Sequence, residues 1–107
     1  MQTAHMLELR PNCEICDHDL PPASPLARIC SYECTYCADC ADRALQGVCP
    51  NCGGNLVARP IRPAHSWRTG TGLATHPPAT QRRSCKWDQA DRAELTARLK
   101  DVAPDQR

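Results

Sequence analysis

The arrangement of the cysteines constrains this chain of 107 residues more than any other feature. Eight of the nine cysteines lie between positions 13 and 52, and the ninth, Cys85, stands apart from them. The eight form four close pairs: Cys13 and Cys16, Cys30 and Cys34, Cys37 and Cys40, and Cys49 and Cys52. Two cysteines separated by two residues can bring both sulfurs to one metal ion, and two such pairs complete a closed tetrahedral zinc site. The spacing therefore predicts two structural Zn2+ ions, each held by four thiolates.

The remaining composition indicates why the chain needs such ions. Leu, Ile, Val and Phe together supply only 15 of the 107 residues, and ten prolines and five glycines interrupt long regular elements. A chain this poor in large apolar residues does not fold by burial alone. A structural zinc ion contributes on the order of 10 kcal/mol to folding. We therefore expect the metal-free protein to be largely unfolded.

The sequence also bears on the cellular compartment in which the protein is expected. No apolar run approaches the ~20 residues that a membrane span needs, and the first ten residues lack the apolar stretch of a signal peptide. We therefore expect a cytoplasmic protein without a membrane partner. In that reducing compartment, cysteines are kept as thiols, which favours metal binding over disulfides.

Composition divides the chain into three parts. Residues 6–63 hold the clustered cysteines and are expected to form a small α+β domain stabilised by metal. Residues 64–87 are rich in Gly, Thr and Pro, which predicts a flexible linker in a mostly disordered tail. Residues 88–102 favour a short amphipathic helix, because Asp88 can cap it and Leu95, Leu99 and Val102 recur on one face. That helix either packs on the metal domain or binds a partner, and the tail continues to residue 107.

Spacing alone leaves two ways to assign the ligands, in sequence or interleaved. The long first gap, the crowded middle and the final Cys49-Pro-Asn-Cys52 resemble a cross-braced RING-like or treble-clef zinc finger, with Cys34 where the RING family usually carries His. This resemblance implies a strand near residues 26–30 and a helix over about 38–46, which Gly47 would end. It favours the interleaved assignment, with Cys13, Cys16, Cys37 and Cys40 at site 1 and Cys30, Cys34, Cys49 and Cys52 at site 2.

A longer resemblance extends beyond the cysteines. The strings Met6–Cys16, Asp19–Pro22, Ala27–Ser31, Glu33–Thr35 and Gly47–Gly54, and the run from Arg59 to Pro63, are similar to a family of short bacterial cysteine-rich proteins, domain-of-unknown-function family 1272. The resemblance implies a bacterial, cytoplasmic zinc protein. It brings no established activity with it.

Charge bears on whether the partner is a nucleic acid. Residues 1–62 carry a formal charge of −2 and residues 63–107 carry +3, and eight zinc-bound thiolates would lower the first value to about −6. An acidic metal domain does not seek phosphate. A nucleic acid could contact the tail through Arg82, Arg83, Lys86 and Trp87. The same basic residues could instead remain solvated, or cover the acidic domain.

Other activities fit less well. Ile15 suits a RING ubiquitin ligase, but Gly53 stands where such a ligase needs a basic residue after its last ligand. The gap of eight residues before Cys49 departs from the ferredoxin spacing of an iron–sulfur protein. Cys85, between Arg83 and Lys86, is either a reactive thiol or a bystander, and His18 receives no ligand role because eight sulfurs fill both sites.

The sequence therefore predicts a zinc-binding protein that is not an enzyme and that binds another protein, with the loop at residues 20–26 as an exposed surface. A nucleic-acid-binding accessory protein and a redox or metal-handling thiol protein are the alternatives.

Overall fold

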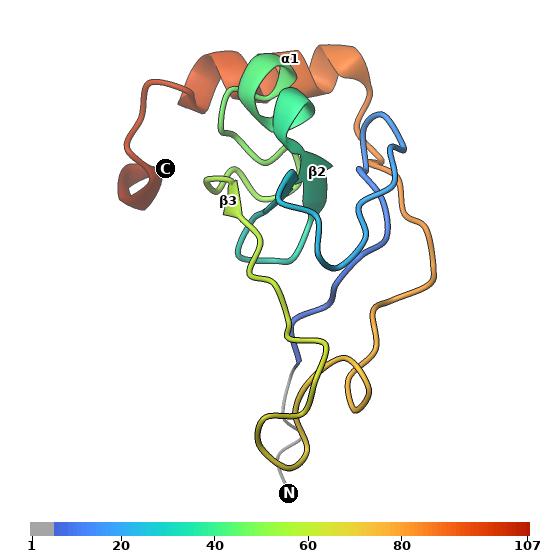
Figure 1. Cartoon of the computed structure of the whole chain (residues 1–107). Helices are drawn as coiled ribbons and strands as arrows, with labels where there is room; N and C mark the ends of the chain where they lie inside the picture. The colour runs from blue at the N-terminus through green and yellow to red at the C-terminus, as the bar shows by residue number, and fades with distance from the viewer. Residues whose placement is uncertain (1–5) are drawn as a thin grey trace, which may run out of the picture.

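The structure is a computed structural model that describes residues 6–107. Its centre is a small antiparallel sheet in the order β2-β1-β3, built from β1 (Ala27–Ile29), β2 (Thr35–Cys37) and β3 (Val57–Ala58) (Figure 1). Ile29 pairs with Thr35 on one side and with Val57 on the other. The strands are so short that they contribute few side chains to a core. The main role of the sheet is to position cysteines. The turn that joins β1 to β2 carries Cys30 and Cys34.

Two of the three helical elements in residues 6–107 lie together above this sheet as Figure 1 draws it. A single π-helical turn, η1 (Cys40–Ala44), follows β2 where the sequence predicts a helix over 38–46. Gly47 has a φ of 78° and stands just beyond this turn, at the predicted end. The predicted helix at 88–102 is present as α1 (Gln89–Leu99), capped by Asp88, whose side chain accepts a hydrogen bond from the Asp91 N–H at 2.9 Å. A short 3-10 turn, η2 (Pro104–Gln106), ends the chain.

Cysteine forms much of the core, as the composition indicates. Leu20, Tyr36 and Leu45 are almost fully buried, and Cys13 and Cys49 have no solvent exposure at all. Ile15 packs against this cluster from its edge. With so few large side chains, the interior consists of sulfur atoms in contact with a thin apolar shell.

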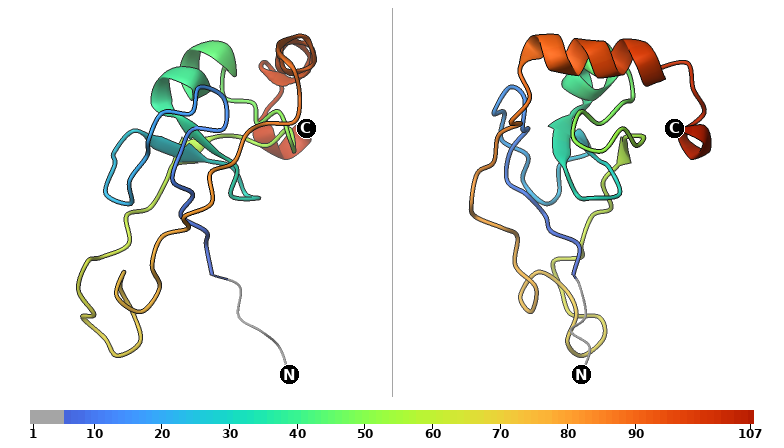
Figure 2. Two further views of the ribbon diagram at one scale, coloured as in Figure 1. Left: turned by 90° about the vertical axis from the view of Figure 1, so that its right-hand side faces the viewer. Right: turned by 180° about the vertical axis from the view of Figure 1, so that it is seen from behind.

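The tail lies along the cysteine domain. Within residues 64–87, all of which the structure describes, there is no helix or strand. The second half of this segment nevertheless runs beside the amino-terminal segment (Figure 2). The N–H of Ala79 donates to the Leu9 carbonyl at 3.0 Å, and the N–H of Cys85 donates to the Glu14 carbonyl at 2.8 Å. A linker composition therefore does not prevent ordered contacts, because backbone groups of the tail find backbone partners in the domain.

The end of the chain also contacts the domain. The hydroxyl of Thr96 on α1 is buried and donates to the Leu45 carbonyl at 3.3 Å. The Arg107 guanidinium donates to the carbonyls of Gly47 and Gly53 at 3.2 and 3.1 Å. The helix thus packs on the metal domain, which is one of the two alternatives for it. Among residues 6–107, no helix is both long enough and apolar enough to cross a membrane.

Candidate metal centres

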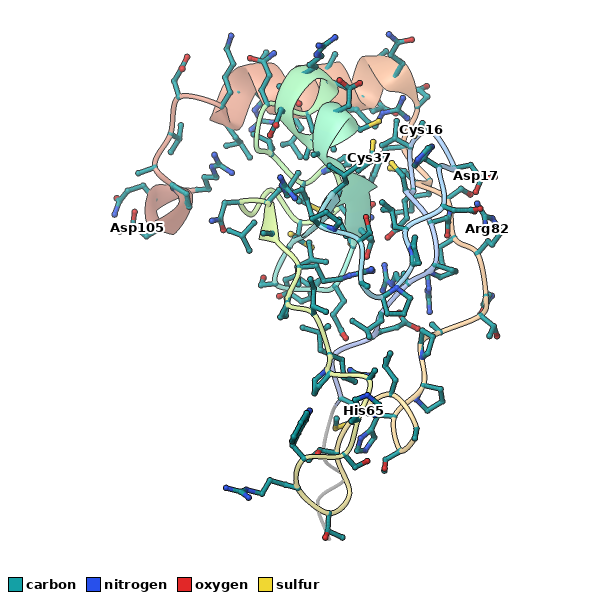
Figure 3. All side chains as sticks on the ribbon, viewed as in Figure 1. Cys16, Asp17, Cys37, His65, Arg82 and Asp105 are labelled. Carbon is teal, nitrogen blue, oxygen red and sulfur yellow. The ribbon has the colours of Figure 1, made fainter. Side chains whose placement is uncertain are left out.

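The first cysteine cluster contains all four sulfurs of the expected site 1. The Sγ atoms of Cys13, Cys16, Cys37 and Cys40 lie within 4.8 Å of one another. The first pair lies in a tight turn, where the Asp17 N–H donates to the Cys13 carbonyl at 2.9 Å. Cys37 ends β2 and Cys40 begins η1, so the sheet carries the second pair to the first (Figure 3).

The dimensions of this cluster fit a tetrahedral metal ion. Zinc–sulfur bonds of about 2.3 Å at tetrahedral angles place neighbouring sulfurs about 3.8 Å apart. The sulfurs of Cys16 and Cys37 are 3.8 Å apart. Both cysteines are free thiols rather than disulfide partners. The four residues can therefore hold one metal ion.

The second cluster brings together three of the four residues expected at site 2. The sulfurs of Cys30, Cys34 and Cys49 lie within 4.8 Å of one another, and all three residues are buried. Cys52 is exposed and its sulfur lies outside this group, where it accepts a hydrogen bond from the Gly54 N–H at 3.3 Å. In both clusters, cysteines from distant pairs meet, so the grouping is interleaved rather than sequential.

Hydrogen-bond donors surround the sulfurs. The N–H of Tyr32 donates to Cys30 at 3.3 Å, and the N–H of Cys40 donates to Cys37 at 3.4 Å. The Asn51 side chain donates to Cys34 at 3.3 Å. Such donors stabilise thiolates and orient them toward a metal ion. Their presence is what a metal-binding cluster requires beyond the cysteines themselves.

The thiol pKa values follow from these contacts. Hydrogen bonds from Cys30 and Cys34, with a further one from Tyr36, lower the pKa of Cys49 to about 4. The Cys34 and Cys49 contacts raise the pKa of the Cys30 thiol above its ordinary value. Burial acts to raise the pKa of Cys13, but backbone N–H donors outweigh it and the pKa falls. Each cluster thus contains a thiol that readily becomes a thiolate, the form that binds metal.

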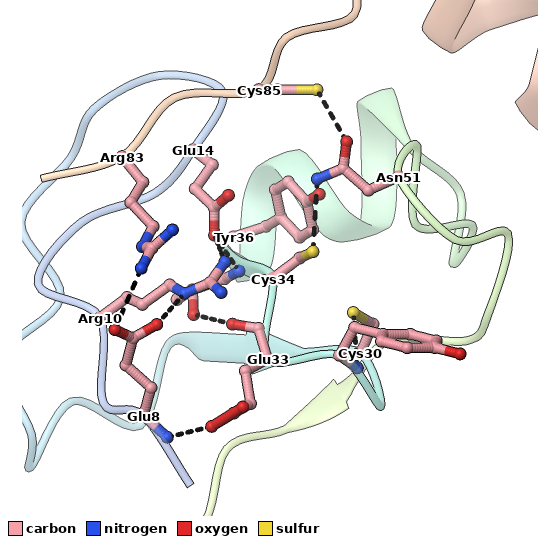
Figure 4. Close-up of polar contacts among 12 residues, drawn as sticks. Glu8, Arg10, Glu14, Cys30, Glu33, Cys34, Tyr36, Asn51, Arg83 and Cys85 are labelled. Atoms are coloured by element: carbon pink, nitrogen blue, oxygen red, sulfur yellow. Dashed lines mark hydrogen bonds and ion pairs between the residues drawn. The ribbon is translucent and has the colours of Figure 1, made fainter.

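Other candidate ligands lie outside both clusters. The His18 carbonyl accepts the Cys13 N–H at 2.8 Å, but its side chain joins neither group of metal-binding residues. The Cys85 sulfur is 4.0 Å from the Asn51 Oδ1 atom, and the same amide donates to Cys34 (Figure 4). The ninth cysteine is thus a neighbour of the second cluster and not a member of it.

The basic residues of the tail face acidic residues of the domain. Arg82 forms ion pairs with Asp17 at 2.8 Å and with Asp19 at 2.7 Å, and Arg83 pairs with Glu8 at 3.3 Å. Lys86 lies over the ring of Trp87, 5.2 Å from its centroid. Of the residues considered for nucleic-acid contact, Arg82 and Arg83 therefore pair with the domain, in the covering arrangement considered as an alternative, whereas Lys86 and Trp87 contact each other.

Sequence reasoning missed a buried carboxylate beside the first cluster. Glu14 is 5% exposed, and its Oε2 accepts hydrogen bonds from the Thr35 N–H at 2.5 Å and from Arg10 at 3.0 Å (Figure 4). These bonds tie the Cys13–Cys16 turn to β2. The sequence offers only the four-residue spacing of Arg10 and Glu14 as a signal, since the Thr35 N–H that donates to the carboxylate is 21 residues away.

Comparisons with known proteins find matches over the cysteine-rich part of the chain. A family model described as "Protein of unknown function (DUF1272)" matches residues 6–62. An uncharacterized protein of Rhizobium meliloti (strain 1021) is 68% identical over 59 residues, which are 55% of this chain and 70% of that protein. No solved structure matches the chain. The family match contains all eight clustered cysteines and ends before the tail.

Proposed function

This chain belongs to the DUF1272 family, whose description assigns no activity, and we propose from its two clusters that it is a protein-binding module held together by two structural zinc ions. The first cluster is the observation that carries this proposal. Four thiolates fill a tetrahedral zinc ion and leave no position for water or substrate. Zinc in such a site stabilises a fold and does not itself catalyse.

The chemistry of the donors supports zinc over other metals. Four sulfurs in a tetrahedral arrangement select zinc or an iron–sulfur cluster, and the spacing before Cys49 differs from that of ferredoxins. At the second site, Cys30, Cys34 and Cys49 would supply three ligands. We assign Cys52 as the fourth because it follows Cys49 in the same turn, which the Gly53 N–H closes by donating to the Cys49 carbonyl at 2.8 Å.

Exposed aromatic residues support a binding role. Trp67 is 75% exposed, Tyr32 is 71% exposed and Trp87 is 41% exposed. Tryptophan and tyrosine supply much of the binding energy at protein interfaces. A chain with so few large apolar residues would gain stability by burying these rings, so their exposure indicates a role other than folding. The loop expected as a surface contributes less than predicted, because Leu20 is buried and only Leu26, at its end, is a large exposed apolar residue.

The nucleic-acid alternative receives less support. Arg82 and Arg83 are paired with carboxylates, so phosphate would have to displace those contacts. The redox or metal-handling alternative would require reactive thiols or metal release under mild oxidant, and the one cysteine apart from the clusters, Cys85, has its sulfur outside both of them.

The test combines metal analysis with partner capture by the full chain. Purified protein should be colourless and contain two zinc ions, and Cys13→Ser and Cys49→Ser should each lower the zinc content. A partner protein retained from the native cell should be stoichiometric with the wild-type chain, resist nuclease, and be lost from both variants. Cys85→Ser is the matched control and should retain two ions and the partner. Iron in a coloured protein, or capture that nuclease abolishes, would refute the proposal.

A further inference from the structure

One segment projects from the domain without contributing to either cluster. Residues 63–76, which we call the tip loop, form the yellow to ochre excursion at the end of the molecule opposite α1 (Figure 1). His65 marks this loop, away from the labelled Cys16 and Cys37 (Figure 3). The loop begins just after the region that matches the family, so it concerns this chain rather than the family as a whole.

The tip loop is closed by its own hydrogen bonds. The N–H of Leu73 donates to the Pro63 carbonyl at 2.9 Å, which joins the two sides of the loop. At its end, the Thr71 hydroxyl donates to the Arg68 carbonyl at 2.6 Å, and the Ser66 hydroxyl donates to the Thr71 carbonyl. A loop closed in this way presents its side chains in a fixed arrangement, which lowers the entropy cost of binding.

Gly72 allows this closed shape. Its φ of 88° lies in the left-handed region, and it is buried within the loop. A Cβ atom at this position would lie 2.8 Å from the His65 carbonyl oxygen, too close for any other residue. The crossing of the two sides of the loop therefore depends on glycine.

The base of the loop is clamped to the domain. The Arg62 guanidinium donates to the His76 carbonyl at 2.7 Å, across the base, and to the Leu7 carbonyl at 2.7 Å. The tip loop is thus anchored to the amino-terminal segment as well as closed on itself.

What the anchored loop presents is an indole ring beside a cation. Trp67 is 75% exposed, and its ring meets the edge of His65 with centroids 6.2 Å apart. The next residue, Arg68, is exposed, and among residues 6–107 its guanidinium has no hydrogen-bond or ion-pair partner. Tryptophan and arginine are the residue types most enriched among those that dominate protein interfaces.

Charge indicates the chemistry of the partner. Residues 43–87 contain no Asp or Glu but seven Arg or Lys residues. Carboxylates of the domain neutralise Arg82 and Arg83 among these. Arg68 in the tip loop is a cation without such a carboxylate among the described residues. A complementary surface would place carboxylates around an apolar pocket.

We propose that the tip loop is the docking surface of the module and that it inserts Trp67 into an apolar pocket of a partner protein, where Arg68 pairs with a carboxylate at the rim. This inference rests on the proposed protein-binding function and names its surface. A nucleic acid fits less well, because binding its backbone requires several free cations near the ring. A membrane also fits less well, because the loop presents one apolar ring among hydroxyl residues and glycines rather than an apolar face.

The test uses the full zinc-loaded chain carrying Trp87→Phe, so that Trp67 is its only tryptophan. The probe is a phage-displayed library of random peptides. We expect the selected peptides to carry Asp or Glu beside an apolar residue and to shift Trp67 fluorescence. Trp67→Ala should weaken their binding by about 30-fold and Arg68→Glu by about tenfold or more. Val57→Ala is the control, because it removes an exposed apolar side chain outside the loop, and it should leave the affinity unchanged.

The following results would overturn this inference. Selected peptides without acidic residues, or binding that Trp67→Ala leaves intact, would place the surface elsewhere. Stronger Trp67-dependent binding of oligo(dT) or of phosphatidylglycerol vesicles would replace a protein partner with a nucleic acid or a lipid. Unchanged zinc content and circular dichroism of Trp67→Ala would show that the variant folds. If the native partner still binds Trp67→Ala but not Cys13→Ser, the proposed function stands and only the tip-loop inference fails.

Discussion

The side chain of Asn12 pairs with both backbone groups of Arg83. Its Nδ2 donates to the Arg83 carbonyl at 2.7 Å, and its Oδ1 accepts from the Arg83 N–H at 3.1 Å. Asn12 has no solvent exposure, and its Nδ2 also donates to Asp17 at 2.9 Å. A residue beside the first cysteine pair therefore holds a segment 71 residues away in the manner of a neighbouring strand. This contact makes the tail part of the folded unit.

Asn12→Ala should release this segment. The substitution removes the hydrogen bonds of a fully buried side chain, which costs about 2 kcal/mol in the free energy of unfolding. Urea denaturation of the zinc-loaded protein measures that loss, and amide exchange should accelerate in residues 79–85. Asn55→Ala is the matched control, because Asn55 is exposed and its loss should change little. Equal effects of the two substitutions would contradict the role assigned to Asn12.

The contacts of Arg82 should depend on salt. Arg82 bridges Asp17 and Asp19, which are 70% and 78% exposed, and ion pairs between exposed groups are screened as ionic strength rises. Raising NaCl from about 0.1 M to about 1 M should therefore accelerate amide exchange in residues 79–85 without releasing zinc. Arg82→Ala should reproduce this acceleration at low salt. Arg43→Ala removes an exposed ion pair between Arg43 in η1 and Asp39 just before it, and should not affect the segment.

The cysteine clusters could be predicted because their signal is local. Each pair needs only a short turn, and the sequence shows the pairs directly, with Gly53 and Gly54 after the last of them. The interleaved grouping depended on a resemblance, since spacing alone allowed two assignments. The position of the Cys52 sulfur outside the second cluster has no local signal.

The tail could not be predicted because its contacts are distant and polar. Composition predicts a flexible linker over residues 64–87, and it cannot show that the Cys85 N–H meets the Glu14 carbonyl. The Glu14 side chain is a similar case, because it accepts a hydrogen bond from the distant Thr35 N–H. Hydrophobic periodicity carries no information on such pairings, which are made by backbone and charged groups.

Two glycines with the same backbone conformation should respond differently to alanine. Gly47 and Gly53 have φ values of 78° and 77°, so a Cβ atom at either costs about 1 to 2 kcal/mol. A Cβ atom at Gly47 would meet nothing, whereas one at Gly53 would lie 3.0 Å from the Leu99 side chain. Gly53→Ala should therefore also loosen α1.

Amide exchange separates the two effects. Both variants should lose similar free energy of unfolding, but only Gly53→Ala should accelerate exchange in residues 95–99. If Gly47→Ala accelerates exchange in α1 as much as Gly53→Ala does, the contact between Leu99 and Gly53 does not hold the helix in place.

The hydroxyl of Tyr36 should affect zinc affinity at the second cluster. The hydroxyl oxygen lies 3.5 Å from the Cys49 sulfur, and Tyr36 is fully buried. Its hydrogen bond is one of those that lower the pKa of Cys49 to about 4. Tyr36→Phe removes that donor and raises the pKa, so protons compete with zinc at a higher pH. As the pH falls, the variant should therefore release its second ion before the wild type does. Its affinity at neutral pH should fall by about tenfold.

A chromophoric zinc indicator measures both the pH at which the second ion is released and the zinc affinity at neutral pH. Tyr32→Phe is the matched control, because Tyr32 is exposed and serves Cys30 through its backbone N–H rather than its hydroxyl. The control should release zinc at the wild-type pH. The first ion should also be unaffected in Tyr36→Phe, because Cys13, Cys16, Cys37 and Cys40 hold it without a tyrosine hydroxyl. Simultaneous loss of both ions would show instead that the hydroxyl supports the whole core, and the role assigned to Tyr36 at Cys49 would be wrong.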